Sequence, residues 1–524
     1  MIIKLIDHSF KWYKDDKVAV IGYAFKDEVL LKEESFSSYI KKALDKECTL
    51  ESILDTLNGF FAIVIEEKDK VYLCCDRTRS LPLFYFMDGN EVKISNFAKV
   101  IVENSFKLDE ESAEEFLYTS FVTGSDTLIK NLKMVQAGEV VTINKESYEI
   151  EKKSYYEFHH EEYMDISKEQ LLNIIHKKYM DAFKRLLTTI DNKTIVVPLS
   201  GGYDSRIIVQ MLYLLNYKNV ICFCYGIACN KEVEISKKVA EHFNFKWIFI
   251  EYTKEKVREM YNSREQCEDF AANYVSLAHF QDYIAVKELK EKKLIPEDAI
   301  FVPGHSGDFI AGSHINKAMT ENRKKNNSIN NEIIKEHYNL FRIKNKKIIN
   351  KKLEKNYKTP NSNKIKDNIS HFEKFDWKER QCKFIINSVR IYEFFNFQWR
   401  IPLWDSELVE LWCKIDYKYR FNRELYKEYA QWLELSQGLH IVNEKKSNGK
   451  SKIKNIAKKI VKNRFVKDIF RFIRFIYSYN TDILGFNWVV RKSIFIKEGI
   501  KGAINDNSVF CDDYLQRIID KSEN

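Results

Sequence analysis

The loop at residues 200–205 reads Ser-Gly-Gly-Tyr-Asp-Ser and combines two glycines, two hydroxyls and one carboxylate. A β-branched run precedes it at residues 194–197, and an apolar run follows at residues 207–209. This order predicts a buried strand, a tight loop and the first turn of a helix. Backbone N–H groups at a helix N-terminus favour a bound anion, and the carboxylate of Asp204 suits Mg²⁺. The loop therefore predicts a phosphate site.

This loop is not the P-loop of kinases and GTPases, because no Gly-Lys-Ser/Thr follows at the required spacing. It instead resembles the pyrophosphate loop of ATP pyrophosphatases, which split ATP into AMP and pyrophosphate. An ordinary glycine turn between a strand and a helix is the alternative, and six matching positions disfavour it. The resemblance implies that pyrophosphate is held by Ser200, Gly201, Gly202, Asp204 and Ser205.

The composition is that of an ordinary globular protein. The 524 residues suffice for two or three domains, with 45% hydrophobic and 31% charged residues. The start lacks a signal-peptide core and no stretch reaches a transmembrane length, so we expect a cytoplasmic location. The ten cysteines are scattered, and Cys222, Cys224 and Cys229 lack a second pair for zinc, which favours buried thiols. The net charge of +9 is spread along the chain and does not predict nucleic-acid binding.

Residues 1–153 alternate short apolar runs with polar turns, for example at residues 18–21, 60–65 and 71–75. Short strands at such close spacing predict a mostly antiparallel, β-rich domain with a few helices. One helix is easily placed, because Asp109 is a predicted N-cap for a segment that runs through Leu117.

Several segments of this region resemble the class II glutamine amidotransferase domain of asparagine synthetases. They are residues 57–62, 76–77, 81–85, 124–128 and 137–139. The resemblance implies an Ntn-hydrolase-like fold, but the family's nucleophile is a cysteine at residue 2, where this chain has Ile2. The Asn-Gly motif that shapes the family's oxyanion hole is also absent. We therefore expect a retained scaffold without glutaminase activity, as in the β-lactam synthetase branch of the family.

From about residue 170 the pattern changes to alternating helices and apolar strands, which predicts a parallel sheet covered by helices. Strands are expected at residues 220–226 and 246–250, with a helix at residues 232–243 between them. Ligands of such sheets lie at the carboxyl ends of the strands. Topology and the family resemblance together therefore place Leu199 and Tyr225 beside a bound adenosine.

The predicted fold class is a two-domain α/β protein. Its first domain, residues 1–153, is an Ntn-hydrolase-like antiparallel α+β domain. Its second, residues 170–440, is a parallel-sheet ATP pyrophosphatase domain of the adenine nucleotide α-hydrolase-like type, with helical additions. Residues 441–524 are expected to form a basic helical extension.

Residues 299–312 form another apolar strand and glycine-rich loop, which resembles a segment of asparagine synthetases. The resemblance implies that Asp308 shares Mg²⁺ with Asp204. His305 stands where the family carries a catalytic glutamate or tyrosine. Its imidazole could take a proton from an attacking amine, or could be an ordinary hydrogen-bonding loop residue. The predicted nucleotide site of this half also includes Leu199, Tyr225, Pro303 and Gly304.

Residues 398–405 resemble the family's Glu-Xaa-Arg-Xaa-Pro-Phe-Leu-Asp motif, with Gln398 in place of the glutamate. An amphipathic helix at residues 379–395 is expected to lead into it. Beyond the motif, Arg423 lies where the family has a lysine that stabilises charge on the α-phosphate. Arginine could do the same, being permanently charged and able to bind phosphate through two nitrogens, and Lys427 is the fallback candidate.

Two basic segments are open to more than one interpretation. Residues 317–368 could be a mobile lid or a solvated helical insertion, and runs of charge favour the second. Residues 445–475 fit an amphipathic helix whose cationic face could contact an anionic membrane surface or a partner. The same helix could instead pack its apolar face on its own domain.

The leading hypothesis is an ATP-dependent amide ligase resembling asparagine synthetase. The carboxylate of a small molecule, glycan or peptide would form an acyl-adenylate, which ammonia or an amine would attack. Phe309 replaces the family's second acid, which puts asparagine itself in doubt as the product. A glutamine-hydrolysing asparagine synthase is an alternative that Ile2 disfavours. A catalytically silent nucleotide-binding protein would account for the departures at His305, Phe309, Gln398 and Arg423, and the sequence leaves the oligomeric state open.

Overall fold

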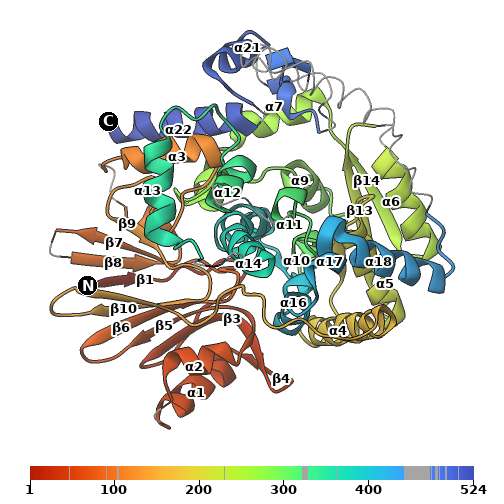
Figure 1. The fold of residues 1–524 in the computed structure, drawn as a ribbon, viewed down its shortest axis with the longest axis horizontal. Coiled ribbons are helices and arrows are strands. Elements are labelled where there is room, and N and C mark those ends of the chain that lie inside the picture. The colour runs from red at the N-terminus through yellow and green to blue at the C-terminus, as the bar shows by residue number, and fades with distance from the viewer. Residues whose placement is uncertain are drawn as a thin grey trace.

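The fold is described from a computed structural model (Figure 1). It covers residues 1–523 apart from 47, 90, 103–105, 229–230, 321–328, 361, 363, 442–471, 474, 478–481, 483, 490–491 and 505–506. Antiparallel strands of the N-terminal half gather on one side of the molecule. The parallel strands of the second half lie on the other side, with helices between the two groups of strands.

The N-terminal half forms two sheets, one ordered β11-β10-β6-β5-β3-β2 with β4 on β3, the other ordered β1-β8-β7-β9. Their strands are β1 (Ile2–Lys4), β2 (Tyr13–Lys14), β3 (Val18–Lys26), β4 (Val29–Lys32), β5 (Asn58–Glu66), β6 (Lys70–Cys75), β7 (Phe84–Asp88), β8 (Glu91–Ser95), β9 (Leu132–Met134), β10 (Glu139–Asn144) and β11 (Ile150–Ser154). Neighbouring strands run antiparallel except for the parallel pair β1 and β8. The predicted antiparallel α+β domain is confirmed.

Strand β5 shows why this sheet is apolar on both faces. Phe61, Ile63 and Ile65 pack beneath helices α1 (Glu33–Leu44) and α2 (Leu50–Asp55), whereas the alternate residues from Phe60 face the main core. The period of two along a strand sends successive side chains to opposite faces. Helix α3 (Glu110–Thr119) begins as predicted, because the Asp109 carboxylate accepts a hydrogen bond from the backbone N–H of Ser112.

The second half is built on a five-stranded parallel sheet ordered β14-β13-β12-β15-β16. Its strands are β12 (Ile195–Pro198), β13 (Val220–Gly226), β14 (Lys246–Glu251), β15 (Ile300–Phe301) and β16 (Gln398–Trp399). Every neighbouring pair is parallel, as the alternating pattern predicted. Strand β15 is only two residues long, so the loop that follows it begins deep inside the sheet.

The second half also contains helices, some packed on this sheet, such as α5 and α6, and some beside the N-terminal half, such as α13 and α22. They are α4 (Lys168–Thr188), α5 (Tyr203–Leu214), α6 (Lys231–His242), α7 (Lys254–Ser263), α8 (Glu265–Ala272), α9 (Tyr283–Glu291), α10 (Gly307–Ile310), α11 (Lys317–Thr320), α12 (Ile329–His337), α13 (Lys346–Asn356), α14 (Ile365–Phe375), α15 (Arg390–Phe394), α16 (Ser406–Cys413), α17 (Tyr417–Arg420), α18 (Glu424–Ser436), α21 (Lys492–Lys501) and α22 (Asn507–Glu523). Helix α6 fulfils the prediction of a helix between the second and third strands. None of the described helices is both long and apolar enough to cross a membrane.

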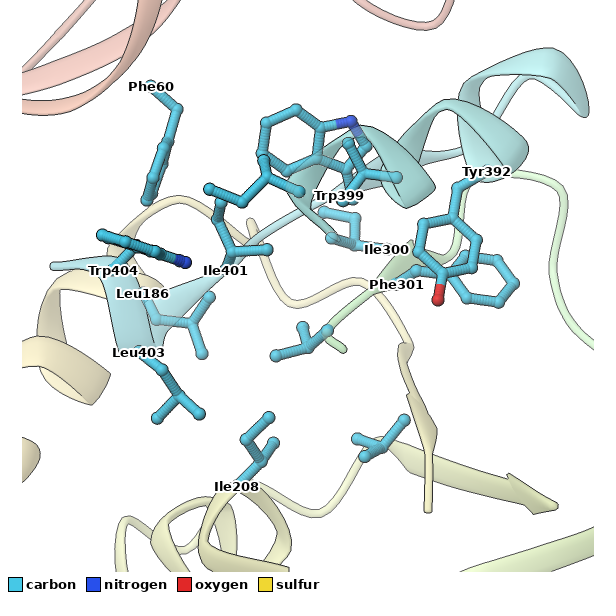
Figure 2. Packing of buried hydrophobic residues seen from close by; sticks show 14 of the residues in the cluster. Phe60, Leu186, Ile208, Ile300, Phe301, Tyr392, Trp399, Ile401, Leu403 and Trp404 are labelled. Atoms are coloured by element: carbon cyan, nitrogen blue, oxygen red, sulfur yellow. The ribbon is translucent and has the colours of Figure 1, made fainter. Parts of the chain in front are cut away.

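The two halves share one continuous hydrophobic core. Figure 2 shows Trp399 of the parallel sheet between Phe60 of the N-terminal sheet and the stacked pair Phe301 and Tyr392. The ring centroids of Phe60 and Trp399 are 6.0 Å apart, and those of Phe301 and Tyr392 are 4.4 Å apart. Aromatic packing across the boundary therefore fixes the parallel sheet against the N-terminal half.

The motif at residues 398–405 lies at this boundary. Arg185 of helix α4 donates two hydrogen bonds of 2.8 Å to the Asp405 carboxylate, which also accepts one from Asn58 of strand β5. The guanidinium of Arg400 lies 4.8 Å from the ring centroid of Tyr23. The motif thus joins the N-terminal sheet to the parallel sheet, and the Gln398 side chain contacts the Ser9 carbonyl and Arg400.

The predicted amphipathic helix at residues 379–395 is wrong in type. Residues Asp376–Ile385 form a π-helix, η2, followed by the 3-10 helix η3 (Ile386–Val389) and then α15. Two of its charged residues, Glu379 and Lys383, are buried. They pair with each other, and Lys383 also donates to the backbone carbonyls of Val122 and Gly124. The charges of Glu379 and Lys383 therefore hold the two halves of the chain together and do not face solvent. The sequence alone did not indicate this.

The structure describes the two basic segments, residues 317–368 and 445–475, to different extents. Helices α11, α12 and α13 bury apolar residues such as Ile333, Ile349 and Leu353 in a second core cluster, so this part of residues 317–368 is helical but not merely solvated. Residues 321–328 lie outside the described residues. The predicted basic helix at 445–475 falls mostly outside them too, although Phe475 is described and stacks on Phe495.

Candidate active site

A cavity of about 570 Å³ opens at the carboxyl ends of strands β12, β13 and β15. This is the edge where parallel sheets bind their ligands. Most of the predicted site residues line it, namely Leu199, Ser200, Gly202, Asp204, Ser205, Tyr225, Pro303, Gly304, His305, Asp308 and Arg423. Gly201 lies in the same loop without being part of the lining. The structure therefore brings together residues that are up to 224 positions apart in the chain.

The 200–205 loop is held in shape by its own hydroxyls. The Ser205 hydroxyl accepts a hydrogen bond of 3.1 Å from the Ser200 backbone N–H, and the Ser200 hydroxyl accepts one of 3.1 Å from the Gly202 N–H. Gly202 is the N-cap of helix α5, so the loop lies at a helix N-terminus, as predicted. Two of the expected anion donors are thus engaged within the loop, while the helix end still favours negative charge.

Two carboxylates meet beside this loop. The backbone N–H of Asp308 donates a hydrogen bond of 3.1 Å to the Asp204 carboxylate, which accepts another of 2.6 Å from the Tyr426 hydroxyl. Burial, and after it the negative charge of Asp308, raises the pKa of Asp204 to about 7. The negative charges of the two carboxylates are therefore incompletely neutralised by their surroundings.

Glycines allow the two loops to approach this closely. A Cβ on Gly304 would lie 2.9 Å from the Ser205 backbone nitrogen. One on Gly307 would lie 2.9 Å from the Tyr426 hydroxyl and 3.1 Å from the Asp204 carboxyl carbon. Ser306 between them has a left-handed φ of 63°, and its hydroxyl donates to Gln381 of η2. The loop after β15 is thus packed backbone against backbone onto the start of helix α5.

A cation, Arg423, lies beside one of these carboxylates. Its guanidinium lies 3.6 Å from the Asp308 carboxylate, with about a third of the Arg423 side chain exposed. Arg423 and the preceding Asn422 both have left-handed backbone conformations, with φ of 59° and 56°, and Arg423 caps helix α18. The strained turn directs Arg423 into the cavity, whereas Lys427 is not among the lining residues.

His305 also lines the cavity. One ring nitrogen, Nε2, is hydrogen-bonded to the Ser388 hydroxyl, and the other, Nδ1, is buried without a partner. Burial, with a smaller effect of His279, lowers the pKa of His305 to about 3. The imidazole is therefore neutral, and its proton affinity in this pocket is low. Phe309, in the short helix α10 that follows, is buried in the core against Phe158 and Trp404.

Tyr225 belongs to a polar network that the sequence did not reveal. Its hydroxyl and that of Tyr392 both donate to the Asp282 carboxylate, and its ring stacks on Tyr252 at 5.2 Å. Asp282 also lines the cavity, as do His279 and Gln281. These three residues lie outside the expected strands and outside the motifs shared with the family, so only the tertiary structure identifies them. Tyr426 could not be identified from the sequence either, except that it lies three residues after Arg423.

The donor set fits Mg²⁺ that arrives with a nucleotide. Within the part of the chain that the structure describes, no group of three or more His, Cys, Asp or Glu side chains could hold a metal alone. Mg²⁺ is usually held by one or two carboxylates together with phosphate oxygens and water, so Asp204 and Asp308 suffice. The raised pKa of Asp204 is the sign of a like-charge pair that a cation would relieve.

Residue 2, where the family resemblance led us to expect a cysteine nucleophile, is an isoleucine. Ile2 lies in β1, at the end of the smaller sheet, and is 37% exposed. Of the ten cysteines, the described ones other than Cys48 are buried, including Cys222 and Cys224, and Cys229 lies outside the described residues. Burial raises the pKa of the Cys222 and Cys224 thiols, to about 11 for Cys224. They are inert thiols, as predicted.

Comparison with protein families agrees with this architecture. The model of the asparagine synthase family matches residues 181–433, which contain the cavity, and the glutamine amidotransferase domain model matches residues 40–156. The two matched regions together cover most of the chain, an amidotransferase-like first domain followed by an asparagine synthase domain. Together they support assignment of the chain to the asparagine synthetase family.

Solved structures show weaker likenesses. An ammonia-dependent NAD synthetase from Campylobacter jejuni, with nitrate, is 12% identical over 28% of this chain and 61% of its own, with a TM-score of 0.20. An NMN synthetase from Francisella tularensis is 12% identical over 28% and 59%, with a TM-score of 0.19. A glutamine phosphoribosylpyrophosphate amidotransferase from B. subtilis, with ADP and GMP, is 10% identical over 57% and 64%, with a TM-score of 0.20.

In each case the match covers less than two thirds of the solved chain. At these scores the likeness says nothing about function. The comparison with curated protein sequences gave no significant match.

Proposed function

We propose that this protein is an AMP-forming ligase that activates a substrate carboxylate with MgATP and passes the acyl group to ammonia or an amine, without a glutaminase of its own. The observation that carries the proposal is the meeting of Asp204 and Asp308 beside a loop at a helix N-terminus. Paired carboxylates short of positive charge, next to an anion-favouring helix end, suit a magnesium-bound pyrophosphate.

In the first step a carboxylate oxygen of the acceptor attacks the α-phosphorus of ATP. The bond from that phosphorus to the bridging oxygen of the β-phosphate breaks, and pyrophosphate leaves. The N-terminus of α5 and the Ser200 and Ser205 hydroxyls hold the leaving group, and Arg423 offsets charge on the phosphates. Asp204 and Asp308 would hold Mg²⁺, which neutralises pyrophosphate charge when bound.

In the second step the nitrogen lone pair of ammonia or an amine attacks the acyl carbon. The bond from that carbon to the phosphate oxygen breaks, AMP leaves, and one proton passes from the nitrogen to a base. The unpartnered Nδ1 of His305 is the candidate acceptor of that proton. Its low proton affinity would rise beside the negative phosphate of the adenylate, because nearby anions raise the pKa of an imidazole.

In this proposal the N-terminal half has a structural role and contributes no catalytic group. Ile2 provides no nucleophile, and thiol or hydroxyl attack is what glutamine hydrolysis requires. The core shared by Phe60 and Trp399 supports a structural role for this half, since it packs against the parallel sheet. Free ammonia or an amine on a second substrate would then be the nitrogen source.

Exchange of labelled pyrophosphate into ATP, with pooled carboxylates that include aspartate and uronic acids, tests the proposal. We expect exchange that depends on one pool and is abolished by Asp204→Ala. Asp298→Ala is the matched control, because Asp298 is exposed before strand β15, at the end away from the cavity. Nucleotide binding without exchange in any pool would contradict the ligase and favour a silent nucleotide-binding protein.

A further inference from the structure

Part of the wall of the cavity beside the 200–205 loop comes from the last part of the chain. Among the described residues that line this cavity, Leu484 is the one that lies beyond residue 440. It is partly buried and belongs to the predicted C-terminal extension, residues 441–524. The other lining residues lie between positions 198 and 423. The cavity therefore includes a residue that no sequence motif assigned to a site.

A short turn fixes the position of Leu484. The Asp482 carboxylate accepts a hydrogen bond of 2.9 Å from the backbone N–H of Leu484 and another of 2.9 Å from that of Asn487. Gly485 is buried and has a left-handed φ of 72°, which glycine adopts without strain. The 3-10 helix η6 (Phe486–Val489) follows and packs on α7. The turn is thus held by its own hydrogen bonds and by a neighbouring helix.

Aromatic rings connect this turn with the wall of the cavity. The ring of Phe486 stacks on that of Tyr252, with centroids 6.3 Å apart, and Tyr252 stacks on Tyr225 at 5.2 Å. Tyr225 lines the cavity. The Tyr252 hydroxyl also donates a hydrogen bond of 2.5 Å to the carbonyl of Gln281, which belongs to another lining segment. Phe486 therefore supports two parts of the cavity wall through Tyr252.

Ion pairs join the end of the chain to the same region. Arg264, between helices α7 and α8, pairs with Asp513 of α22. Arg517 of α22 pairs with Glu268 of α8, which is 2% exposed. Buried charges of this kind require their partners, so α22 is firmly attached to α8. The described parts of the extension therefore pack on the helices that follow strand β14, beside the turn that carries Leu484.

The position of Leu484 indicates which part of a nucleotide it would meet. Phosphates held by the 200–205 loop and Arg423 leave the rest of the cavity, toward the end of strand β13, for the nucleoside. Leu484 enters the cavity next to Phe486, whose stack with Tyr252 leads to Tyr225 at the end of that strand. An apolar side chain offers no hydrogen bond to a phosphate, but it packs well on the face of a purine base.

We propose that Leu484 forms part of the adenine subsite, so that the C-terminal extension is a component of the nucleotide site. This rests on the proposed function, in which MgATP is the first substrate. Leu484 contacts the base. Phe486 is a positioning residue that acts through Tyr252 and Tyr225. The extension thus contributes to recognition of the base and leaves the phosphates to the 200–205 loop.

Photolabelling tests the contact directly. The probes are 2-azido-ATP and 8-azido-ATP with Mg²⁺, which on illumination attach to residues beside the base. The labelled peptides are mapped after digestion with trypsin. We expect at least one probe to label the peptide of residues 475–491, which contains Leu484, and excess ATP to prevent the label. Absence of label from this peptide with both probes would overturn the proposal.

Calorimetry of Leu484→Ala separates recognition of the base from folding. MgATP binding should weaken about fivefold to tenfold, because an apolar contact is lost. Magnesium tripolyphosphate has no base and should bind as it does to wild type. Leu484→Met keeps an apolar side chain and should bind MgATP almost as wild type does. Ile500→Ala is the matched control, because Ile500 of α21 belongs to the same extension and is 76% exposed.

Phe486→Ala should weaken MgATP binding by a smaller factor than Leu484→Ala, again without changing the binding of tripolyphosphate. Equal losses for the two ligands in Leu484→Ala, or no loss for either, would overturn the adenine subsite and leave the ligase in place. Wild type that does not bind MgATP would contradict both. A loss in Leu484→Ala that is specific to MgATP, without pyrophosphate exchange in any carboxylate pool, would keep the subsite and contradict the ligase.

Discussion

The backbone N–H of Asp308 donates a hydrogen bond of 3.1 Å to the carboxylate of Asp204. The two residues follow β15 and β12, which are neighbours in the parallel sheet. Burial and the charge of Asp308 raise the pKa of Asp204 to about 7, so the contact is costly without a cation. Under the proposed function, Mg²⁺ bound with the nucleotide would relieve this repulsion.

Gly307→Ala should separate these loops. The added Cβ would lie 2.7 Å from the Leu403 Cδ1 and 2.9 Å from the Tyr426 hydroxyl. We expect stability to fall by about 1–3 kcal/mol, and pyrophosphate exchange to fall by about 10²-fold because the carboxylates are displaced. Urea unfolding and exchange assays measure the two effects. Gly89→Ala is the control: its Cβ meets no atom within 4 Å, and its φ of +56° limits the effect to stability.

Arg423 and Lys427 should differ sharply, although both are cations at the start of α18. Arg423 lines the cavity and Lys427 does not. Arg423→Ala should therefore reduce pyrophosphate exchange by about 10²-fold, since a charged donor aimed at a phosphate is lost. Lys427→Ala should leave the rate nearly unchanged. Equal losses in the two variants would show that the assignment of phosphate stabilisation to Arg423 is wrong.

Neither wild type nor Ile2→Cys should release glutamate from glutamine. The wild type has no N-terminal nucleophile, and the variant gains a thiol on the exposed edge strand β1 without oxyanion donors. Glutamate release is measured enzymatically, with ammonia-dependent pyrophosphate exchange as the control for folding. Release by wild type would mean that the N-terminal half has a nucleophile elsewhere.

Arg420→Met should destabilise the protein by about 3–5 kcal/mol, because it leaves the buried Glu373 carboxylate without its cationic partner. Arg420 and Glu373 are both fully buried, 2.9 Å apart, and Arg420 also donates to the Ile310 carbonyl at the end of α10. Urea unfolding measures the loss. The double variant Arg420→Met/Glu373→Leu should recover more than half of it, although His160 loses its partner too. A double variant no more stable than Arg420→Met would contradict this explanation.

Stability should fall in acid partly through His371, which lies far from the cavity on α14. Burial, with a smaller effect of Lys374, lowers the pKa of His371 from 6.5 to about 4. As the pH drops below 6.5 the unfolded chain binds a proton that the folded chain rejects, so stability is lost until about pH 4. Wild type should lose about 2 kcal/mol more than His371→Gln between pH 7 and pH 4. Identical losses in urea unfolding would show that His371 is not responsible.

The local sequence determined the strands and their loops. The β-branched run before Ser200 and the two glycines after it are sufficient for a strand, a turn and a helix start, since these depend on neighbouring residues. Asp109 could be identified as an N-cap for the same reason. The order of strands and helices also implied a parallel sheet, and the carboxyl ends of its strands placed Leu199, Tyr225 and Asp308 at one edge.

The tertiary structure alone decided which distant groups meet. The π-helix η2 buries Glu379 and Lys383 because they satisfy each other and backbone of the N-terminal half, a contact that no periodic pattern encodes. Asp282 joins Tyr225 and Tyr392 through folding of separate segments. The pKa of His305 depends on burial, which is a property of the packed chain. Sequence specifies local geometry, whereas charge pairing and desolvation arise only when the two halves pack together.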